Sequence, residues 1–240
     1  NRALSCYNAL RKDRQGGAVR GVKSIKEQIY YAILEDILHG EYRSRDVLNE
    51  RSLVEKYKCS KAPVREALLL LCNDHVLRSI PRYGYEIIRL TSEDVRDMMT
   101  FRLLLECGQM SACYKDFTPR QLGCLAAIDE KCRQVDLEIW DHWRYNKEFH
   151  VKMISFCGND YITDELERCM DRLERAYAQS IVDSAAPPPL SMDTKHHRLI
   201  LECLERKDLG GLLQALKEDL ADFGNDHYHF LAEFDRIYPV

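Results

Sequence analysis

The chain has 240 residues, 45% hydrophobic and 31% charged, which is ordinary for a globular protein of one large domain or two modest ones. No run approaches the roughly 18 consecutive apolar residues that a membrane-spanning helix needs, and no signal-peptide pattern opens the sequence. The ten cysteines form no CxxC pair, which excludes a zinc ribbon and favours reduced thiols in a cytoplasmic protein.

The formal net charge is -4, but the charges are unevenly distributed along the chain. Residues 1–90 carry 17 Lys and Arg against 11 Asp and Glu, a net +6, and residues 91–240 carry 18 against 28, a net -10. This asymmetry is typical of a basic nucleic-acid-binding module joined to an acidic body. Uneven surface charge without such a function is the alternative, since the excess is modest.

The first 22 residues contain three glycines and five basic residues without a sustained hydrophobic period. We expect residues 1–22 to form a flexible basic arm. A helix should follow, because Ser24 stands three residues before Glu27 and apolar residues then recur at helical intervals as far as Gly40. Residues 41–47 are expected to form a polar loop.

Two short amphipathic helices joined by a tight turn are predicted next. The first has an apolar face formed by Leu48, Leu53, Val54 and Tyr57. The second begins at Ser60, a favourable N-cap, and carries Pro63 in its first turn, where a missing N–H costs little.

One edge of the second helix is suited to DNA. Its apolar positions 64, 67, 68 and 71 should face inward, which leaves Lys61, Ala62 and Arg65 on the opposite edge. That N-terminal edge is the part of a recognition helix that meets the major groove. A capped surface helix with ordinary exposed charges is the alternative.

A basic hairpin should come after this helix pair. Residues 76–80 and 85–89 are short alternating segments on either side of the turn sequence Pro81-Arg82-Tyr83-Gly84. A hairpin in this position is the wing of a winged helix-turn-helix. Arg82 and Arg78 are suited to contact phosphate, and Gly84 lets the backbone approach the minor groove.

The sequence resembles the GntR family of bacterial transcription regulators in three motifs. They are residues 50–54 (ERSLV), residues 59–68 (CSKAPVREAL) and residues 82–85 (RYGY). The resemblance implies a winged helix-turn-helix over residues 23–90 that binds double-stranded DNA. The implied contacts are Arg51, Ser60, Lys61, Ala62, Arg65, Arg82, Tyr83 and Gly84. Lys61 stands where the family usually has Arg, and Lys lacks the planar bidentate geometry that contacts guanine, so base preference should differ there.

Residues 91–240 show six helical patterns and no strand signal, which predicts an all-α six-helix bundle. Thr91 and Thr118 are the expected N-caps of the first two helices. The second helix should run to about residue 135, and the others are expected at 137–156, 160–180, 192–206 and 209 to about 229. A rigid proline-rich loop, residues 185–189, separates the fourth helix from the fifth. The fold class is therefore mainly α, with a winged helix-turn-helix before the bundle.

Four polar residues of the bundle are candidates for one buried site. Asn146 and His150 are four residues apart and share a helix face, while His197 and Asp219 lie on two later helices. Two imidazoles, a carboxylate and an amide suit a divalent metal, which accepts N and O ligands. The alternative is that these histidines only fill space in the core or on the surface and form no common site.

The helical region resembles the FCD domain, the ligand-sensing half of FadR-type GntR regulators. The matching motifs are residues 101–106 (FRLLLE), 146–150 (NKEFH) with Gly158-Asn159, and 197–200 (HRLI). The resemblance implies an effector-binding and dimerisation domain over residues 91–240. It also implies a Zn, Ni or Mn ion, and an effector site, on Asn146, His150, His197 and Asp219.

Two positions depart from the metal-binding pattern of that domain. Asn146 replaces an Asp and Asp219 replaces a His, so the carboxylate has moved within the ligand set. In a metal-free alternative, Asp219 holds His150 or His197 as an imidazolium that binds an anion directly. Arg102 matches an Arg near the effector cavity of FCD domains, where it would bind the carboxylate of a small organic acid. An i, i+4 salt bridge to Glu106 is its alternative role.

These patterns together predict a dimeric, effector-responsive transcription regulator, a repressor rather than an enzyme, that reads a pseudo-palindromic operator. One alternative is a metal-dependent enzyme on the helical bundle, although no HExxH motif occurs and Glu148 projects away from the Asn146 and His150 face. Another is a scaffold protein with a degenerate DNA-binding head.

Overall fold

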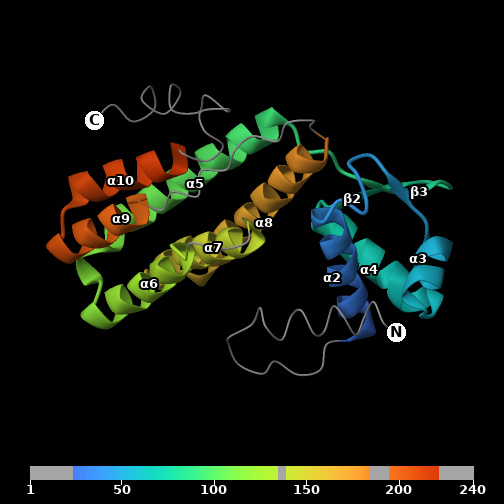
Figure 1. Ribbon diagram of the computed structural model, residues 1–240, viewed down its shortest axis with the longest axis horizontal. Coiled ribbons are helices and arrows are strands. Elements are labelled where there is room, and N and C mark those ends of the chain that lie inside the picture. Colours follow the sequence, from blue (N-terminus) through green and yellow to red (C-terminus); the bar gives the residue numbers. More distant parts are fainter. Residues whose placement is uncertain (1–23, 135–138, 184–194, 222–240) are drawn as a thin grey trace. The chain divides into compact units, whose positions relative to one another are not determined.

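The computed structural model describes residues 24–134, 139–183 and 195–221 (Figure 1). The expected basic arm, the proline-rich loop at 185–189 and any helix beyond residue 221 lie outside these residues. Within the described ranges, no helix has both the length and the apolar character needed to cross a membrane.

The chain divides into two compact units, which are described separately below. Of the described residues, the first unit holds 24–90 and 177–183, and the second holds 91–134, 139–176 and 195–221.

The first unit is a winged helix-turn-helix, as predicted. Its elements are α2 (Ile25–Leu38), β1 (Val47–Leu48), α3 (Glu50–Tyr57), α4 (Lys61–Asn73), β2 (Leu77–Ile80) and β3 (Gly84–Ile87). The predicted capping box of α2 is present, because Ser24 accepts from the Glu27 N–H and the Glu27 carboxylate accepts from the Ser24 N–H. Gly40 follows the helix with φ +76°, which is the left-handed conformation expected of it.

The core of the first unit lies where α2, α3 and α4 pack against the sheet. Its fully buried side chains come from every one of these helices and from the wing strands: Ile29, Ile33, Leu53, Val64, Ala67, Leu68, Leu71, Leu77 and Ile87. Positions 64, 67, 68 and 71 of α4 are buried as the helical period predicted. Their burial fixes which edge of α4 faces solvent.

The wing contains one strand more than the sequence indicates. Val47, predicted to end a polar loop, forms β1 with Leu48 and pairs antiparallel with β3, so that the strand order is β1-β3-β2. A strand of two residues is too short for a periodic pattern and forms only because β3 supplies its hydrogen-bond partners. Gly84 has φ +142°, and a Cβ at this position would overlap the carbonyl oxygen of Leu48. Gly84 therefore allows the close approach of β1 and β3.

The last turns of helix α8 (Asp160–Asp183) belong to the first unit. The buried Gln179 amide donates to the carbonyl of Ile88 at 2.8 Å and accepts from the N–H of Leu90 at 2.9 Å. The Ser44 hydroxyl donates to the Asp183 carboxylate at 2.5 Å. These bonds attach the end of α8 to the segment that follows the wing and to the loop that precedes β1.

The second unit is the predicted six-helix bundle. Besides α8 it contains α5 (Ser92–Cys113), a 3₁₀ turn η1 (Tyr114–Asp116), α6 (Pro119–Cys132), α7 (Ile139–Ser155), α9 (Lys195–Arg206) and α10 (Leu209–Ala221). Thr91 and Thr118 cap α5 and α6 as expected, each within a capping box. Helix α10 packs on α5 and α9, and α6 packs on α7 and α9. The buried core between these helices includes Met110, Leu125, Phe149, Leu166 and Leu216.

The expectation that the cysteines are reduced thiols is wrong for two of them. Cys113, at the end of α5, and Cys157, just after α7, form a disulfide with Cα atoms 5.8 Å apart. The two residues are 44 positions apart, so only the packing of α5 against α7 brings them together. The other cysteines of the described segments are free thiols: Cys59, Cys72, Cys107, Cys124, Cys132, Cys169 and Cys203.

Candidate functional site

The residues predicted to contact DNA lie on α3, at the start of α4 and in the wing. All are exposed except Gly84, which is partly buried. The side chains of Arg51, Lys61 and Arg65 are 90%, 73% and 66% exposed. Ser60 precedes α4 as predicted, but its hydroxyl makes no capping hydrogen bond. These groups are accessible to a ligand, and their contacts with DNA stay a prediction.

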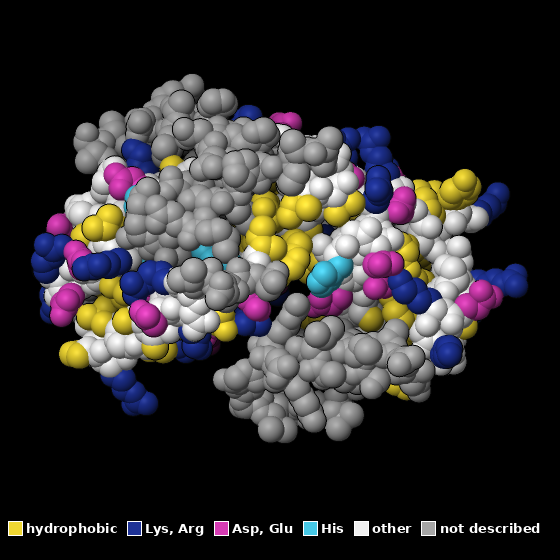
Figure 2. Space-filling view, in the orientation of Figure 1, with side chains coloured by type: hydrophobic (Ala, Val, Ile, Leu, Met, Phe, Trp, Pro, Cys, Tyr) yellow, Lys and Arg dark blue, Asp and Glu magenta, His cyan; other side chains and the backbone are white. Residues whose placement is uncertain are grey.

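The tip of the wing presents a basic and an aromatic side chain. Arg82 is exposed and has φ +67°, and Tyr83 is one of the most exposed large side chains of the described chain. Arg78 is already engaged, because its Nε lies 2.6 Å from the Glu86 carboxylate across the hairpin. Figure 2 shows basic and acidic side chains next to one another over the part of the first unit that holds α3 and the wing. Cations of this unit are therefore partly balanced by neighbouring carboxylates.

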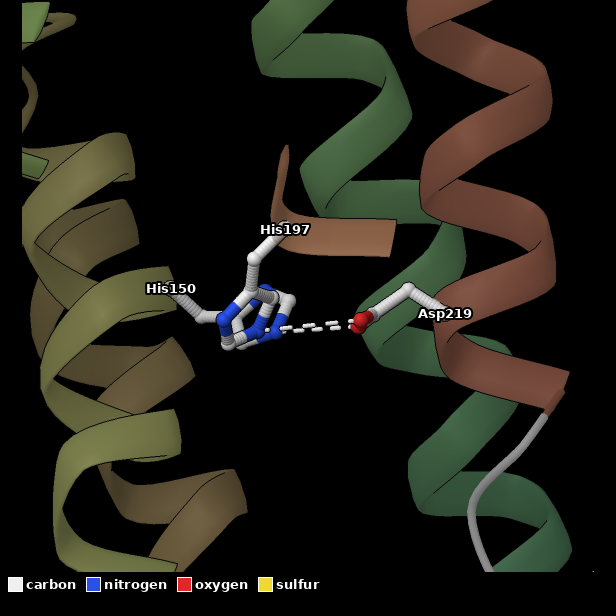
Figure 3. A group of neighbouring side chains, drawn as sticks. All are labelled: His150, His197 and Asp219. Carbon is white, nitrogen blue, oxygen red and sulfur yellow. Dashed lines mark ion pairs between the residues drawn. The ribbon is translucent and has the colours of Figure 1, made fainter. Parts of the chain in front are cut away.

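Three of the four predicted metal ligands converge in the second unit. His150 comes from α7, His197 from α9 and Asp219 from α10, and one ligand atom of each lies within 4.8 Å of the others (Figure 3). Nε2 of His150 is 3.0 Å from Oδ2 of Asp219, and Nε2 of His197 is 3.7 Å from Oδ1. Both rings thus direct the same nitrogen at one carboxylate. Both imidazoles are fully buried, and Asp219 is 9% exposed.

A second carboxylate stands behind each imidazole. Oε2 of Glu106, on α5, lies 2.7 Å from Nδ1 of His150. Oδ1 of Asp129, on α6, lies 3.5 Å from Nδ1 of His197. Metal-binding histidines are commonly oriented by such a carboxylate, which holds a proton on one nitrogen and leaves the other free to bind. The hydrogen bond to Glu106 therefore turns Nε2 of His150 toward Asp219, whereas Asp129 lies beside Nδ1 of His197 without a hydrogen bond.

The buried charges of this cluster alternate in sign. Arg102 Nε lies 2.9 Å from Glu106, which contacts His150, which contacts Asp219. Burial lowers the pKa of His150, but the carboxylates of Glu106 and Asp219 together have the larger effect and raise the pKa to about 9. Burial raises the pKa of Asp219, but His150 holds it well below its usual range. For Glu106, burial raises the pKa, and Arg102 and His150 together bring it below the ordinary value.

The donor atoms fit a divalent metal. Among the described residues, both nitrogens of the buried His197 ring lack a hydrogen bond, although carboxylate oxygens lie 3.5 and 3.7 Å from them. Buried polar atoms without a partner are rare, because each such atom costs about 1–3 kcal/mol. Two imidazole nitrogens and one carboxylate oxygen form a ligand set typical of Zn, Mn or Fe, with coordination positions left for an added ligand. The site therefore has the chemistry of a metal centre that can also bind a small molecule.

Asn146 and Arg102 stand beside these three residues. Asn146 lies one turn before His150 and is partly buried, but within the described chain no hydrogen bond joins it to the cluster, so its role stays a prediction. Arg102 is only 3% exposed and does form the alternative salt bridge with Glu106. Its Nη2 atom is buried with no partner among the described residues. That atom is available to a bound anion.

The sequence did not reveal the three residues that surround the imidazoles. The sequence indicates Glu106 only as a partner of Arg102 and gives no signal for Asp129, because their contacts with His150 and His197 run between helices. His142 is a further buried imidazole, two turns before His150, and burial lowers its pKa. The spacing of His142, Asn146 and His150 at i, i+4 and i+8 was the available signal.

Comparisons with known proteins agree with this architecture. Residues 25–87 match the family described as "Bacterial regulatory proteins, gntR family", and residues 97–222 match the FCD domain. The HTH-type transcriptional regulator YdhC of Bacillus subtilis is 25% identical over 84% of this chain and 89% of its own length. The gluconate operon transcriptional repressor of B. subtilis is 23% identical over 81% and 82%.

A solved structure shares the fold. The structure of E. coli McbR/YncC superposes with a TM-score of 0.67 at 19% sequence identity, covering 90% of this chain and all of that one. The two matched regions together span most of the sequence, in the order of the two structural units. The chain belongs to the gntR family of bacterial regulatory proteins, with an FCD domain after its DNA-binding domain, and is a DNA-binding transcription regulator rather than an enzyme.

Proposed function

We propose that this regulator represses transcription in the cytoplasm, and that a small organic acid bound in its helical unit changes its affinity for DNA. A homodimer would place two copies of α4 on a pseudo-palindromic operator, because a two-fold protein maps onto a two-fold site. A relative that is named as a repressor of a gluconate operon supports the repressor role and an acid as effector.

The observation that carries the proposal is the shared orientation of two buried imidazoles. His150 and His197 both direct Nε2 at Asp219, and each has a carboxylate beside Nδ1. A bound Zn, Ni or Mn ion would supply a Lewis acid that binds a carboxylate oxygen of the effector. His150, His197 and Asp219 would hold this ion.

The chain's own residues would fix the acid's orientation. The unpartnered Nη2 of Arg102 would donate to one carboxylate oxygen, while the Glu106 salt bridge keeps the guanidinium in place. In a metal-free mode, the carboxylate of the effector would take the place of Asp219 at Nε2 of His150, an imidazole whose pKa is raised to about 9 by its neighbours. Adding and removing the metal separates the two modes.

The effector proposal is tested with full-length protein stripped by a chelator. Fluorescence anisotropy would follow its binding to DNA from upstream of its own gene, with and without Zn²⁺, Ni²⁺ or Mn²⁺, and with gluconate, citrate or acetate. We expect at least one acid to shift affinity about tenfold in the loaded protein, the usual size of an allosteric coupling. Arg102→Met should abolish the shift. A response that survives Arg102→Met, or no response in any combination, would contradict the proposal.

The DNA contacts are tested separately. Arg65→Ala should reduce operator affinity by about 1–3 kcal/mol, as expected for a lost base contact. Operator binding should also weaken steeply as salt rises, because cations displace counterions from phosphate. A scaffold with a degenerate head would show neither sequence preference nor salt dependence.

A further inference from the structure

Glu50 connects the three DNA-facing elements of the first unit. It is the first residue of α3, and its Oε2 lies 3.1 Å from Nζ of Lys61, at the start of α4. Its Oε1 lies 3.9 Å from Nε of Arg65 and accepts a hydrogen bond from the Tyr85 hydroxyl of β3 at 3.5 Å. One carboxylate therefore lies within reach of two recognition-helix cations and of the wing.

The position of Glu50 differs from that of an ordinary surface acid. Its side chain is 21% exposed, whereas those of Lys61 and Arg65 are 73% and 66% exposed. By contrast, Glu55 pairs with Arg51 inside a single helix, with both side chains largely in solvent. Exposed pairs of that kind contribute little, because water screens them. Glu50 is therefore a partly buried anion beside two exposed cations.

Such an anion has two effects on DNA binding. It orients cations that would otherwise sample many rotamers, and Lys61 needs this most, because an ammonium group has no planar fork to define its direction. It also repels any phosphate that approaches Lys61 and Arg65. Binding to arbitrary DNA depends almost entirely on cation–phosphate attraction, whereas a correct base edge supplies additional acceptor atoms.

We propose that Glu50 determines the DNA specificity of this regulator by holding Lys61 and Arg65 toward the base edges and weakening their attraction to phosphate. A carboxylate that opposes unwanted ligands while positioning the groups for the right one is a common source of specificity. The inference rests on the DNA-binding function and concerns the ratio of operator to non-operator affinity. A role in fold stability alone would leave that ratio unchanged.

Glu50→Gln in the full-length protein tests the proposal, since it removes the charge and keeps the shape. Fluorescence anisotropy would measure binding to the footprinted operator and to a scrambled duplex of equal length at several KCl concentrations. We expect affinity for the scrambled duplex to rise about 3–10-fold, with a salt dependence steeper by about one counterion. Operator affinity should rise less or fall, so that the affinity ratio drops about tenfold.

Two matched variants separate this role from its alternatives. Glu66→Gln removes a carboxylate of α4 that pairs with Lys26 and, in the described structure, with neither Lys61 nor Arg65, and it should leave the ratio within about twofold. Glu50→Asp keeps the charge but withdraws it from Lys61, and should lower the ratio less than Glu50→Gln does. It also remains informative if Glu50→Gln fails to fold.

The outcomes are distinct. An unchanged ratio in Glu50→Gln, or equal losses on both duplexes with a lowered melting temperature, would overturn the specificity role and leave the DNA-binding function intact. A wild-type protein without preference for any operator would overturn both.

Discussion

Glu106 and His150 are joined by a buried contact of 2.7 Å between Oε2 and Nδ1, although they lie on different helices. The contact fixes His150 so that Nε2 faces Asp219 at 3.0 Å. The Glu106 carboxylate of α5 therefore determines the direction of Nε2 of His150 on α7 and orients this imidazole toward the cluster.

Glu106→Gln should weaken binding of a divalent metal by about 10–100-fold, the usual effect of losing a carboxylate behind a metal-binding His. It should also destabilise the protein by about 3–5 kcal/mol, because Arg102 loses its buried counter-charge. Metal titration calorimetry and urea unfolding measure the two effects. Glu130→Gln, at a carboxylate 75% exposed on α6, is the control and should change neither. Unaltered metal affinity in Glu106→Gln would show that the contact does not orient the ligand.

Asn146→Asp restores a carboxylate one turn before His150. If the Asn146 side chain faces the metal, the added charge should raise affinity for Zn²⁺ or Mn²⁺ about tenfold, because carboxylates are stronger ligands than amides for these ions. Competition with a chromogenic chelator measures the change. Asn159→Asp provides a charge-matched control, since Asn159 caps α8 by accepting from the Ile162 N–H. Equal affinities in both variants would exclude Asn146 from the ligand set.

Gly84→Ala should disrupt the wing. The new Cβ would overlap the Leu48 carbonyl, and Ala does not readily adopt φ +142°. We expect a loss of about 1–3 kcal/mol in unfolding free energy and weaker DNA binding.

Gly123→Ala on α6 is the control for this variant, because the new Cβ would meet no atom within 4 Å in the described structure. It should stabilise the protein by about 0.5–1 kcal/mol. Thermal unfolding of the two variants would contradict this account if both shifted in the same direction.

Gln179→Ala should loosen the segment after the wing. It removes the hydrogen bonds to Ile88 and Leu90, which leaves two backbone groups without partners at a cost of about 1–3 kcal/mol each if they stay buried. Hydrogen exchange should become faster at residues 88–90. Arg168→Ala, on the exposed face of the same helix, should change stability by less than about 0.5 kcal/mol. Unchanged exchange at Leu90 would show that the amide does not anchor this segment.

Much of this fold follows from local sequence signals. Ser24 and Glu27 predicted their capping box, and Thr91 and Thr118 were expected as N-caps, because these signals lie within a few residues of each helix start. Contacts between distant segments were not predictable in this way. Strand β1 exists only through pairing with β3, and the Cys113–Cys157 disulfide depends on the packing of α5 against α7. No pattern of neighbouring residues in the sequence predicts the strand or the disulfide.

In the candidate site, too, the sequence predicted residues with a local signal but not the contacts between helices. The spacing on α7 and the residue types at positions 197 and 219 were enough to select His150, His197 and Asp219, which the structure brings together. Glu106 and Asp129 were missed as orienting groups because their significance depends on which helix faces which. Glu50 was visible in a motif, but its contact with Lys61 and Arg65 required the angle between α3 and α4.

We propose that His150, His197 and Asp219 form a metal-binding centre in the helical unit. Isothermal titration of chelator-stripped full-length protein with Zn²⁺ tests it most directly, with Asp219→Ala and His150→Ala compared against His39→Ala, a half-exposed histidine on the first unit. We predict one high-affinity site per chain in the wild type and in His39→Ala, and affinity lower by about 100-fold or more when a ligand of the cluster is removed. Tight one-to-one binding that survives both Asp219→Ala and His150→Ala would contradict it.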